Sequence, residues 1–225
     1  MSSGPTGADG TSLPVTRGLL RRWAAGWLVT LLAVAVVLAS LVGAHALDLG
    51  DRILLHATQT LASPPLDVAM AAMSFLGGLE LTVPAALALT LLARRSGRWF
   101  WVPLAVFLTL NLIELGGKNL VPQLPVPPAL ARGPRLGIVV STAYSFPSGH
   151  MTRVTMLAGW AALAAWRRRP SQAWLWGCVA LVWLMGFGRV YLGDHWPTDV
   201  AGGILLGGAG LALALLLAPE AVLMV

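Results

Sequence analysis

Charged residues and cysteine are both scarce in this sequence. Only 11% of the 225 residues are charged and 57% are hydrophobic, whereas a soluble domain carries roughly 25% charged residues. The single cysteine, Cys178, lies within an apolar run, which excludes an intrachain disulfide and a cysteine-based metal site. The scarcity of charge therefore predicts an integral membrane protein.

Acidic residues are fewer than basic ones, and the formal net charge is +6. A basic chain can indicate a nucleic-acid partner, but here the arginines form short clusters at the ends of apolar runs and are not interleaved with aromatic residues on a soluble face. Such clusters are typical of membrane topology. We therefore expect the bilayer, and no nucleic acid, as a partner.

Six apolar segments approach the ~20 residues that a helix needs to cross a hydrocarbon core. Residues 1–16 are rich in Ser, Gly, Thr and Pro, which predicts a disordered tail, and residues 17–225 are expected to form a single all-α transmembrane domain. The small residues around His45 resemble a signal-peptide cleavage site, so cleavage of the first segment is an alternative. The predicted spans are 23–44, 68–93, 99–117, 148–166, 173–187 and 197–218.

Two connecting segments are too polar or too rich in proline to span a bilayer. Residues 47–67 include Asp48, Asp51 and Arg52, and their amphipathic pattern predicts an interfacial helix between the first two spans. The segment after Lys118 contains five prolines, which forbid a regular helix and favour an extended, fairly stiff loop. These are Pro122, Pro125, Pro127, Pro128 and Pro134.

The arginine clusters predict how the spans are oriented. Three arginines lie in each of the segments 17–22, 94–98 and 167–169, and cytoplasmic segments carry the excess of Lys and Arg. Six spans place all three clusters on one side, so we expect both termini in the cytoplasm. The remaining connections then face the extracytoplasmic side, and the expected location is a plasma membrane of the bacterial type.

One histidine motif joins two of the apolar segments, at residues 188–199. Asp199 follows His195 by four residues, and Pro197 between them is a favoured first helical residue. A carboxylate there can accept from one ring nitrogen of His195 and leave the other lone pair free for nucleophilic attack. Arg189 offers a planar guanidinium to phosphoryl oxygens. This pattern indicates a phosphate-handling site at a bilayer surface.

A second motif, Pro-Ser-Gly-His at 147–150, opens another predicted helix. Ser148 and Gly149 would present free backbone N–H groups to an anion, and Gly149 has no side chain to block close approach. His150 is placed to protonate a leaving oxygen and later to activate water. Lys118, the only lysine, has Glu114 one helical turn earlier as its expected partner.

Together these residues resemble the type 2 phosphatidic acid phosphatase superfamily, whose motifs are K-x6-R-P, P-S-G-H and S-R-x5-H-x3-D. The second motif is complete at 147–150, and Arg189, His195 and Asp199 match the third at full spacing with Gly188 in place of serine. The first motif is degenerate, because 125–126 hold Pro-Val where Arg-Pro is expected. Arg153, three residues after His150, is the preferred substitute for the missing arginine, and Arg132 is the second choice.

The resemblance implies a metal-independent phosphatase without a cofactor. His195 would attack phosphorus, Asp199 would orient it, and His150 would act as acid and then as base. Lys118, Ser148, Gly149 and Arg189 would bind the phosphate group. Because the site lies beside a membrane, the expected substrate is a lipid phosphate or a polyprenyl diphosphate.

Three other interpretations fit parts of the pattern. The chain can be a phosphotransferase that passes the phosphoryl group to a lipid or sugar acceptor. The missing first-motif arginine fits a catalytically silent phospholipid-binding membrane protein, and charges within apolar segments also occur in small transporters. The presence of both motif histidines together with Asp199 favours hydrolysis. The sequence does not predict the oligomeric state.

Overall fold

The computed structural model describes residues 13–134, 136–138 and 142–223. Most of the predicted disordered tail, residues 1–12, lies outside these ranges. Residues 13–16 already belong to the first helix, α1 (Leu13–Gly43). The helix thus begins before the arginine cluster and not after it.

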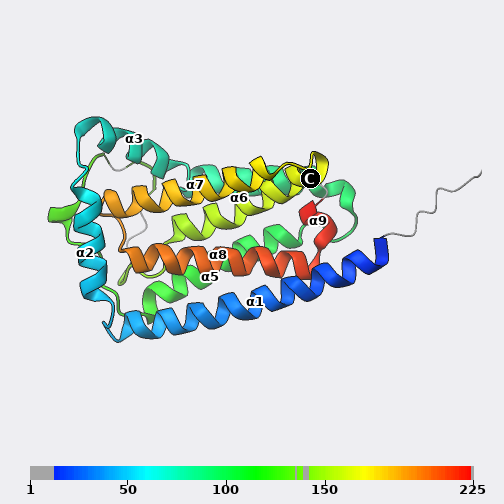
Figure 1. Ribbon diagram of the computed structural model, residues 1–225, viewed down its shortest axis with the longest axis horizontal. Coiled ribbons are helices and arrows are strands. Elements are labelled where there is room, and N and C mark those ends of the chain that lie inside the picture. The colour runs from blue at the N-terminus through cyan, green and yellow to red at the C-terminus, as the bar shows by residue number, and fades with distance from the viewer. Residues whose placement is uncertain (1–12, 135, 139–141, 224–225) are drawn as a thin grey trace, which may run out of the picture.

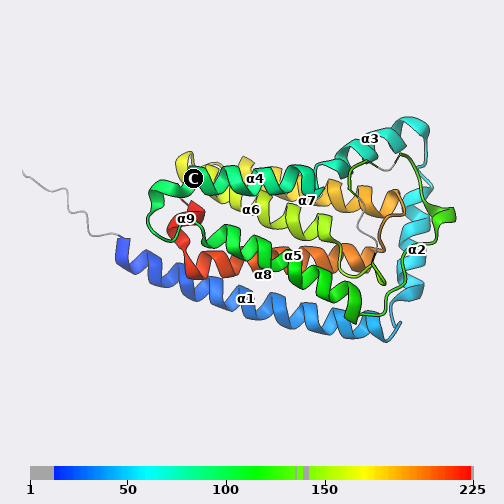
Figure 2. The same ribbon diagram turned by 180° about the vertical axis from the view of Figure 1, so that it is seen from behind.

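Every regular element in the described ranges is helical, which confirms the all-α prediction. The long helices lie side by side, whereas α2 lies across one end of the bundle (Figure 1, Figure 2). After α1 the elements are α2 (Asp48–Gln59), α3 (Pro64–Phe75), α4 (Leu79–Leu92), η1 (Ala93–Ser96), α5 (Val102–Leu120), η2 (Pro128–Leu130), α6 (Gly149–Arg168), α7 (Gln172–Tyr191), α8 (Pro197–Leu217) and α9 (Pro219–Leu223).

Helix α8 packs closely against α6, and two glycines make this possible. A Cβ atom on Gly203 would lie 2.6 Å from Cβ of Met151, and one on Gly207 would lie 2.8 Å from Cβ of Thr155. Small residues four apart are typical of such close packing between membrane helices. Since the two histidine motifs lie at the starts of α6 and α8, this contact holds the motifs next to each other.

Large apolar side chains cover the outside of the bundle. Val29 and Val36 on α1, and Trp176 and Trp183 on α7, are all exposed. A monomeric soluble protein rarely leaves contiguous apolar surfaces of this kind uncovered, whereas lipid tails are as apolar as these side chains. The outer surface is that of a protein surrounded by lipid.

Among the residues that the structure describes, three helices are long and apolar enough to cross a membrane: Gly18–Gly43, Gln172–Tyr191 and Pro197–Leu217. Helices α3 and α4 together form a fourth candidate, broken by a 42° bend. Helices α5 and α6 lie within the bundle (Figure 2), but they carry the polar residues of the motifs, among them Lys118 and Arg153. Hydropathy therefore supports three or four of the six predicted spans.

Two predicted spans differ from the structure, and one short helix was not predicted. The span predicted at 68–93 is interrupted between Phe75 and Leu79, where Gly77 and Gly78 lie and where glycine weakens a helix. The fifth predicted span ends at residue 187, but α7 continues to Tyr191, so Arg189 projects from a helix and not from a turn. The short helix α9 was not predicted.

The chain connections divide between the two ends of the bundle. The start of α1, the α4–α5 and α6–α7 connections and α9 lie at one end, whereas α2, the start of α6 and the start of α8 lie at the other (Figure 1). The arginine clusters therefore lie at the end opposite to the histidine motifs. This arrangement agrees with the separation that the sequence predicted.

Candidate active site

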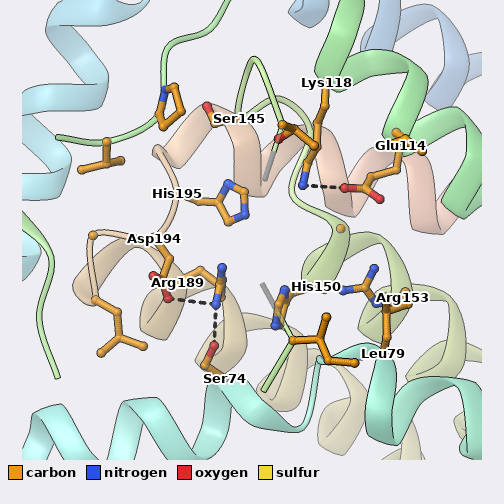
Figure 3. A pocket seen from close by; sticks show the side chains of 18 of the residues that line it. Ser74, Leu79, Glu114, Lys118, Ser145, His150, Arg153, Arg189, Asp194 and His195 are labelled. Atoms are coloured by element: carbon orange, nitrogen blue, oxygen red, sulfur yellow. Dashed lines mark hydrogen bonds and ion pairs between the residues drawn. The ribbon is translucent and has the colours of Figure 1, made fainter. Parts of the chain in front are cut away.

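A cavity of about 530 Å³ lies at the end of the bundle where the histidine motifs meet. Its wall carries five basic or imidazole side chains from α5, α6, α7 and the turn at 192–196, and they point toward a common space (Figure 3). The structure therefore brings together the residues predicted from both motifs and from the degenerate first one. These five residues are Lys118, His150, Arg153, Arg189 and His195.

His195 is held by the carboxylate predicted to orient it. Its Nδ1 lies 3.1 Å from Oδ2 of Asp199, which also accepts a hydrogen bond from the backbone N–H of Trp196 at 3.0 Å. Asp199 is fully buried. An ionised carboxylate can only accept, so Nδ1 carries the proton and Nε2 keeps its lone pair.

The turn that carries His195 depends on a glycine. Gly193 has a φ of +67°, and a Cβ atom there would collide with the carbonyl oxygen of Leu130 in the proline-rich loop. Glycine adopts this left-handed conformation without steric cost. The backbone N–H groups of Asp194 and His195 then donate to the carbonyl oxygen of Arg189 at 3.1 and 3.3 Å, which ties the turn to the end of α7.

Burial lowers the pKa of His195 well below its ordinary value, and the positive charge of Arg189 lowers this pKa further. The imidazole is buried, with 6% of the residue exposed. Both effects disfavour the charged ring. His195 is therefore neutral at pH 7, as a nucleophile must be.

Arg153 enters the cavity from α6, one turn after His150. It donates from Nε to the carbonyl oxygen of Gly77 and from Nη1 to Oδ1 of Asn111, both at 3.2 Å. Its Nη2 lies 3.5 Å from Nδ1 of His150. If Nδ1 of His150 accepts this long contact, the neutral ring carries its proton on Nε2. The ring becomes an acid only when it gains a second proton.

Two acids line the same cavity and pair with its cations. Nζ of Lys118 lies 2.6 Å from Oε1 of Glu114, which confirms the predicted pair. Nη1 of Arg189 lies 2.9 Å from Oδ2 of Asp194 and donates to Oγ of Ser74 at 2.5 Å (Figure 3). Asp194 was not among the predicted site residues, although it lies inside the third motif.

Ser148 and Gly149 lie differently from the predicted phosphate cradle. Ser148 is fully buried, its backbone N–H donates to the carbonyl oxygen of Asp199 at 3.0 Å, and its Oγ has no hydrogen-bond partner among the described residues. Gly149 lines the cavity, but a Cβ atom there would lie 2.7 Å from Oε1 of Glu114. The absent side chain thus makes room for Glu114.

Arg132, the second choice for the missing arginine, requires a correction. Its Nε and Nη2 donate to the two carboxylate oxygens of Asp67 at 3.1 and 3.2 Å, and Asp67 also accepts from the hydroxyl of Tyr191. Within the described part of the chain, Arg132 is not in the cavity wall. This ion pair attaches the proline-rich loop to α3, which explains why the guanidinium turns away from the histidines.

A buried carboxylate on α2 supports the start of α8 and was missed by the sequence analysis. Oδ1 of Asp51 accepts from the backbone N–H of Thr198 at 2.9 Å, and its Oδ2 accepts from Oγ1 of Thr198 at 2.6 Å and from Nε2 of Gln123 at 3.1 Å. Burial raises the pKa of Asp51, although these hydrogen bonds oppose the rise. Asp51 thus caps α8 in the turn that holds Asp199.

Two further polar residues at the cavity were also missed, Ser74 on α3 and Asn111 on α5. Each is a polar side chain in a mainly apolar segment, and polar residues in membrane helices usually face the protein interior. That signal was available in the sequence. It does not reveal the partner of either residue, because Arg189 and Arg153 come from other helices.

The cavity lining also includes apolar residues, of which Leu112, Leu136 and Ile138 are exposed. The cavity therefore combines a charged interior with an apolar side that reaches the protein surface. As to metal ligands, the described ranges contain no group of three or more His, Cys, Asp or Glu side chains that could hold an ion.

A family model described as the PAP2 superfamily matches residues 99–222, which is more than half of the chain. Phosphatidylglycerophosphatase B of Escherichia coli is 35% identical over 122 residues, or 52% of this chain and 45% of that protein. Undecaprenyl-diphosphatase of Sulfolobus acidocaldarius is 39% identical over 66 residues, or 29% of this chain and 30% of that protein. This chain thus spans less than half the length of these curated relatives.

A similar fold occurs in the crystal structure of a transmembrane PAP2-type phosphatidylglycerolphosphate phosphatase from Bacillus subtilis. The match covers 83% of this chain and 92% of that chain, with a TM-score of 0.69 and 24% identity. At this identity the likeness establishes the fold alone. The transmembrane fold and the exposed apolar helices identify the chain as an integral membrane protein.

Proposed function

The chain belongs to the PAP2 superfamily, and from this premise we propose that it is a membrane phosphatase that hydrolyses a lipid phosphate or polyprenyl diphosphate through a phosphohistidine. The observation that carries the proposal is the His195–Asp199 pair, in which a buried carboxylate holds Nδ1 at 3.1 Å and leaves Nε2 as the nucleophile. His150, the proposed acid, lines the same cavity (Figure 3).

In the first step Nε2 of His195 attacks phosphorus, and the bond between phosphorus and the leaving oxygen breaks. The negative phosphate group favours the imidazolium form of His150, which gives one proton to that oxygen and becomes neutral, so the leaving group departs as a neutral alcohol or as a protonated lipid phosphate. In the second step water attacks the phosphohistidine while neutral His150 accepts a proton from the water and becomes the imidazolium again. The P–N bond then breaks, which returns neutral His195 and releases inorganic phosphate.

Three cationic side chains would balance the charge on the phosphoryl group. Lys118, Arg153 and Arg189 come from α5, α6 and α7 and line one cavity. Stabilisation of the transferring group by fixed charges is the main requirement of phosphoryl transfer. Arg153 lies where a guanidinium can replace the one absent from the first motif, and the pairing of Arg132 with Asp67 supports this choice.

The membrane setting and the exposed apolar residues of the cavity lining support a lipid substrate. Leu112, Leu136 and Ile138 offer a surface for a lipid chain while the phosphate group occupies the charged interior. The relatives named above are a phosphatidylglycerophosphatase and an undecaprenyl-diphosphatase. Both a glycerolipid monophosphate and a polyprenyl diphosphate are therefore proposed substrates.

We further propose six spans, with α5 and α6 included, and a plasma membrane of the bacterial type. The bundle arrangement of α5 and α6 supports this count. The arginine clusters lie at the end opposite to the cavity, and positive charge favours the cytoplasmic side. The active site would then face the extracytoplasmic side, with α2 lying at the interface.

The proposal is tested by measuring phosphate release from detergent-solubilised phosphatidate, phosphatidylglycerophosphate and short and long polyprenyl diphosphates, with EDTA present. His195→Ala should abolish release and the acid-labile phosphoenzyme. His56→Ala removes an exposed histidine of α2 outside the cavity and is the matched control. Release by His195→Ala at the wild-type rate, or an absolute need for a divalent ion, would refute the mechanism.

A further inference from the structure

Arg189 already holds an anion in the structure, and that anion belongs to the protein. The carboxylate of Asp194 lies 2.9 Å from Nη1 of Arg189, and their side chains are only 20% and 10% exposed. Both residues line the cavity and point into it (Figure 3). The carboxylate therefore occupies a position next to the guanidinium where a phosphate oxygen would bind.

The neighbouring cation is compensated in the same way. Lys118 pairs with Glu114 at 2.6 Å, so two of the three cationic side chains assigned to phosphate binding face acids that line the same cavity. The five side chains Lys118, Arg153, Arg189, Glu114 and Asp194 carry a formal charge of +1. A phosphate monoester carries about −1.5 to −2 at pH 7. An incoming phosphate must therefore compete with the internal carboxylates.

We propose that Asp194 is a counter-ion that Arg189 exchanges for the substrate phosphate and takes back when inorganic phosphate leaves. This inference rests on the proposed phosphatase function and adds a residue that sets phosphate affinity and product release. In the empty cavity the ion pair keeps Arg189 in place. In the loaded cavity the guanidinium contacts phosphoryl oxygens and the carboxylate turns away.

Asp194 suits this exchange better than Glu114 does. Asp194 lies in the turn at 192–196, directly before His195, and its carboxylate leaves Arg189 by a change of side-chain rotamer alone. Glu114 lies on α5, is 8% exposed, and packs against Gly149. Its movement would disturb the start of α6, whereas movement of Asp194 leaves the helices unchanged.

The proposal predicts that removal of the charge from Asp194 strengthens phosphate binding. Asp194→Asn keeps the size of the side chain and removes the carboxylate charge that competes with phosphate for Arg189. We expect the inhibition constant for inorganic phosphate and its dissociation constant to fall about ten-fold, as for the loss of one close charged competitor. If release of phosphate then limits turnover, kcat falls together with KM.

The experiment uses the full chain purified in detergent, with inorganic phosphate as the probe in calorimetry and as the inhibitor in lipid phosphate hydrolysis. Asp48→Asn is the matched control, because it makes the same charge change on a partly exposed residue of α2 outside this cavity. Asp194→Glu keeps a carboxylate and should stay near the wild-type constants. Thermal melting verifies folding, and Asp194→Ser replaces Asp194→Asn if the latter unfolds.

The two proposals fail in different ways. Phosphate binding by Asp194→Asn that is unchanged or weaker than in the wild type overturns the exchange, since the carboxylate would then align Arg189 and not compete with the ligand. A folded wild-type protein that binds no phosphate and releases none from any lipid overturns the proposed function itself. Equal tightening in Asp194→Asn and Asp48→Asn also overturns the exchange, because it would reflect net charge alone.

Discussion

Replacement of Asp199 by asparagine tests how the proposed nucleophile is activated. Oδ2 of Asp199 accepts from both Nδ1 of His195 and the backbone N–H of Trp196. If the NH2 group of the asparagine took the position of Oδ2, it would place a donor against the N–H of Trp196. The carbonyl oxygen of the asparagine must therefore take that position. Both hydrogen bonds then survive, the ring keeps its tautomer, and only the negative charge is lost.

The size of the effect follows from the charge that develops on the ring. Formation of a bond at Nε2, while Nδ1 keeps its proton, makes the imidazole cationic. Two unit charges about 4 Å apart interact by about 4 kcal/mol at an effective dielectric constant of about 20, and each 1.36 kcal/mol corresponds to ten-fold in rate. The amide dipole retains part of this interaction energy, so we expect kcat to fall by a factor of about 10² to 10³.

The assay is phosphate release under saturating substrate, with kcat and KM measured separately for wild type, Asp199→Asn and Asp48→Asn. KM should change little, because the ring becomes charged only during the reaction. A loss of less than ten-fold would refute the charge argument. A loss of about 10⁴ or more would indicate a switched tautomer, as in serine proteases, and would refute the orientation that we derive from Trp196.

Two further predictions concern the cations and the nucleophile. Arg153→Ala should lower kcat/KM by about 10²-fold, which is the usual cost of removing one donor to a transition-state oxyanion. Arg132→Ala should lower the melting temperature, because its ion pair with Asp67 is lost, and should leave kcat/KM near the wild-type value. The reverse order in the same assay would reassign the phosphate-binding role. The second prediction concerns His195, whose pKa is lowered by burial in the folded protein. Below about pH 6.5 the unfolded chain therefore binds more protons at this residue than the folded protein does. The free energy of unfolding should consequently fall as the pH drops from about 6.5 toward 5. Thermal melting of wild type and His195→Ala from pH 7 to pH 5 measures this without titrating the substrate, and an equal slope for both proteins would contradict it.

Much of the fold follows from local patterns in the sequence. Apolar runs of about 20 residues predict helices, and α5, α6 and α8 lie close to their predicted limits. The break between α3 and α4 was missed because hydropathy averages over Gly77 and Gly78 and registers no change in direction. The extension of α7 to Tyr191 was missed because the motif residues, among them Arg189, are polar.

The sequence alone determines the His195–Asp199 pair, since two residues four apart across a helix start are within reach whatever the rest of the chain does. It likewise determines the motif order and the separation of the arginine clusters from the histidines. Only the tertiary structure decides between Arg153 and Arg132, pairs Arg189 with Asp194 and Ser74, and places Asp51 under α8. Those choices depend on which helices pack together, and the sequence spacing of their residues does not contain that information.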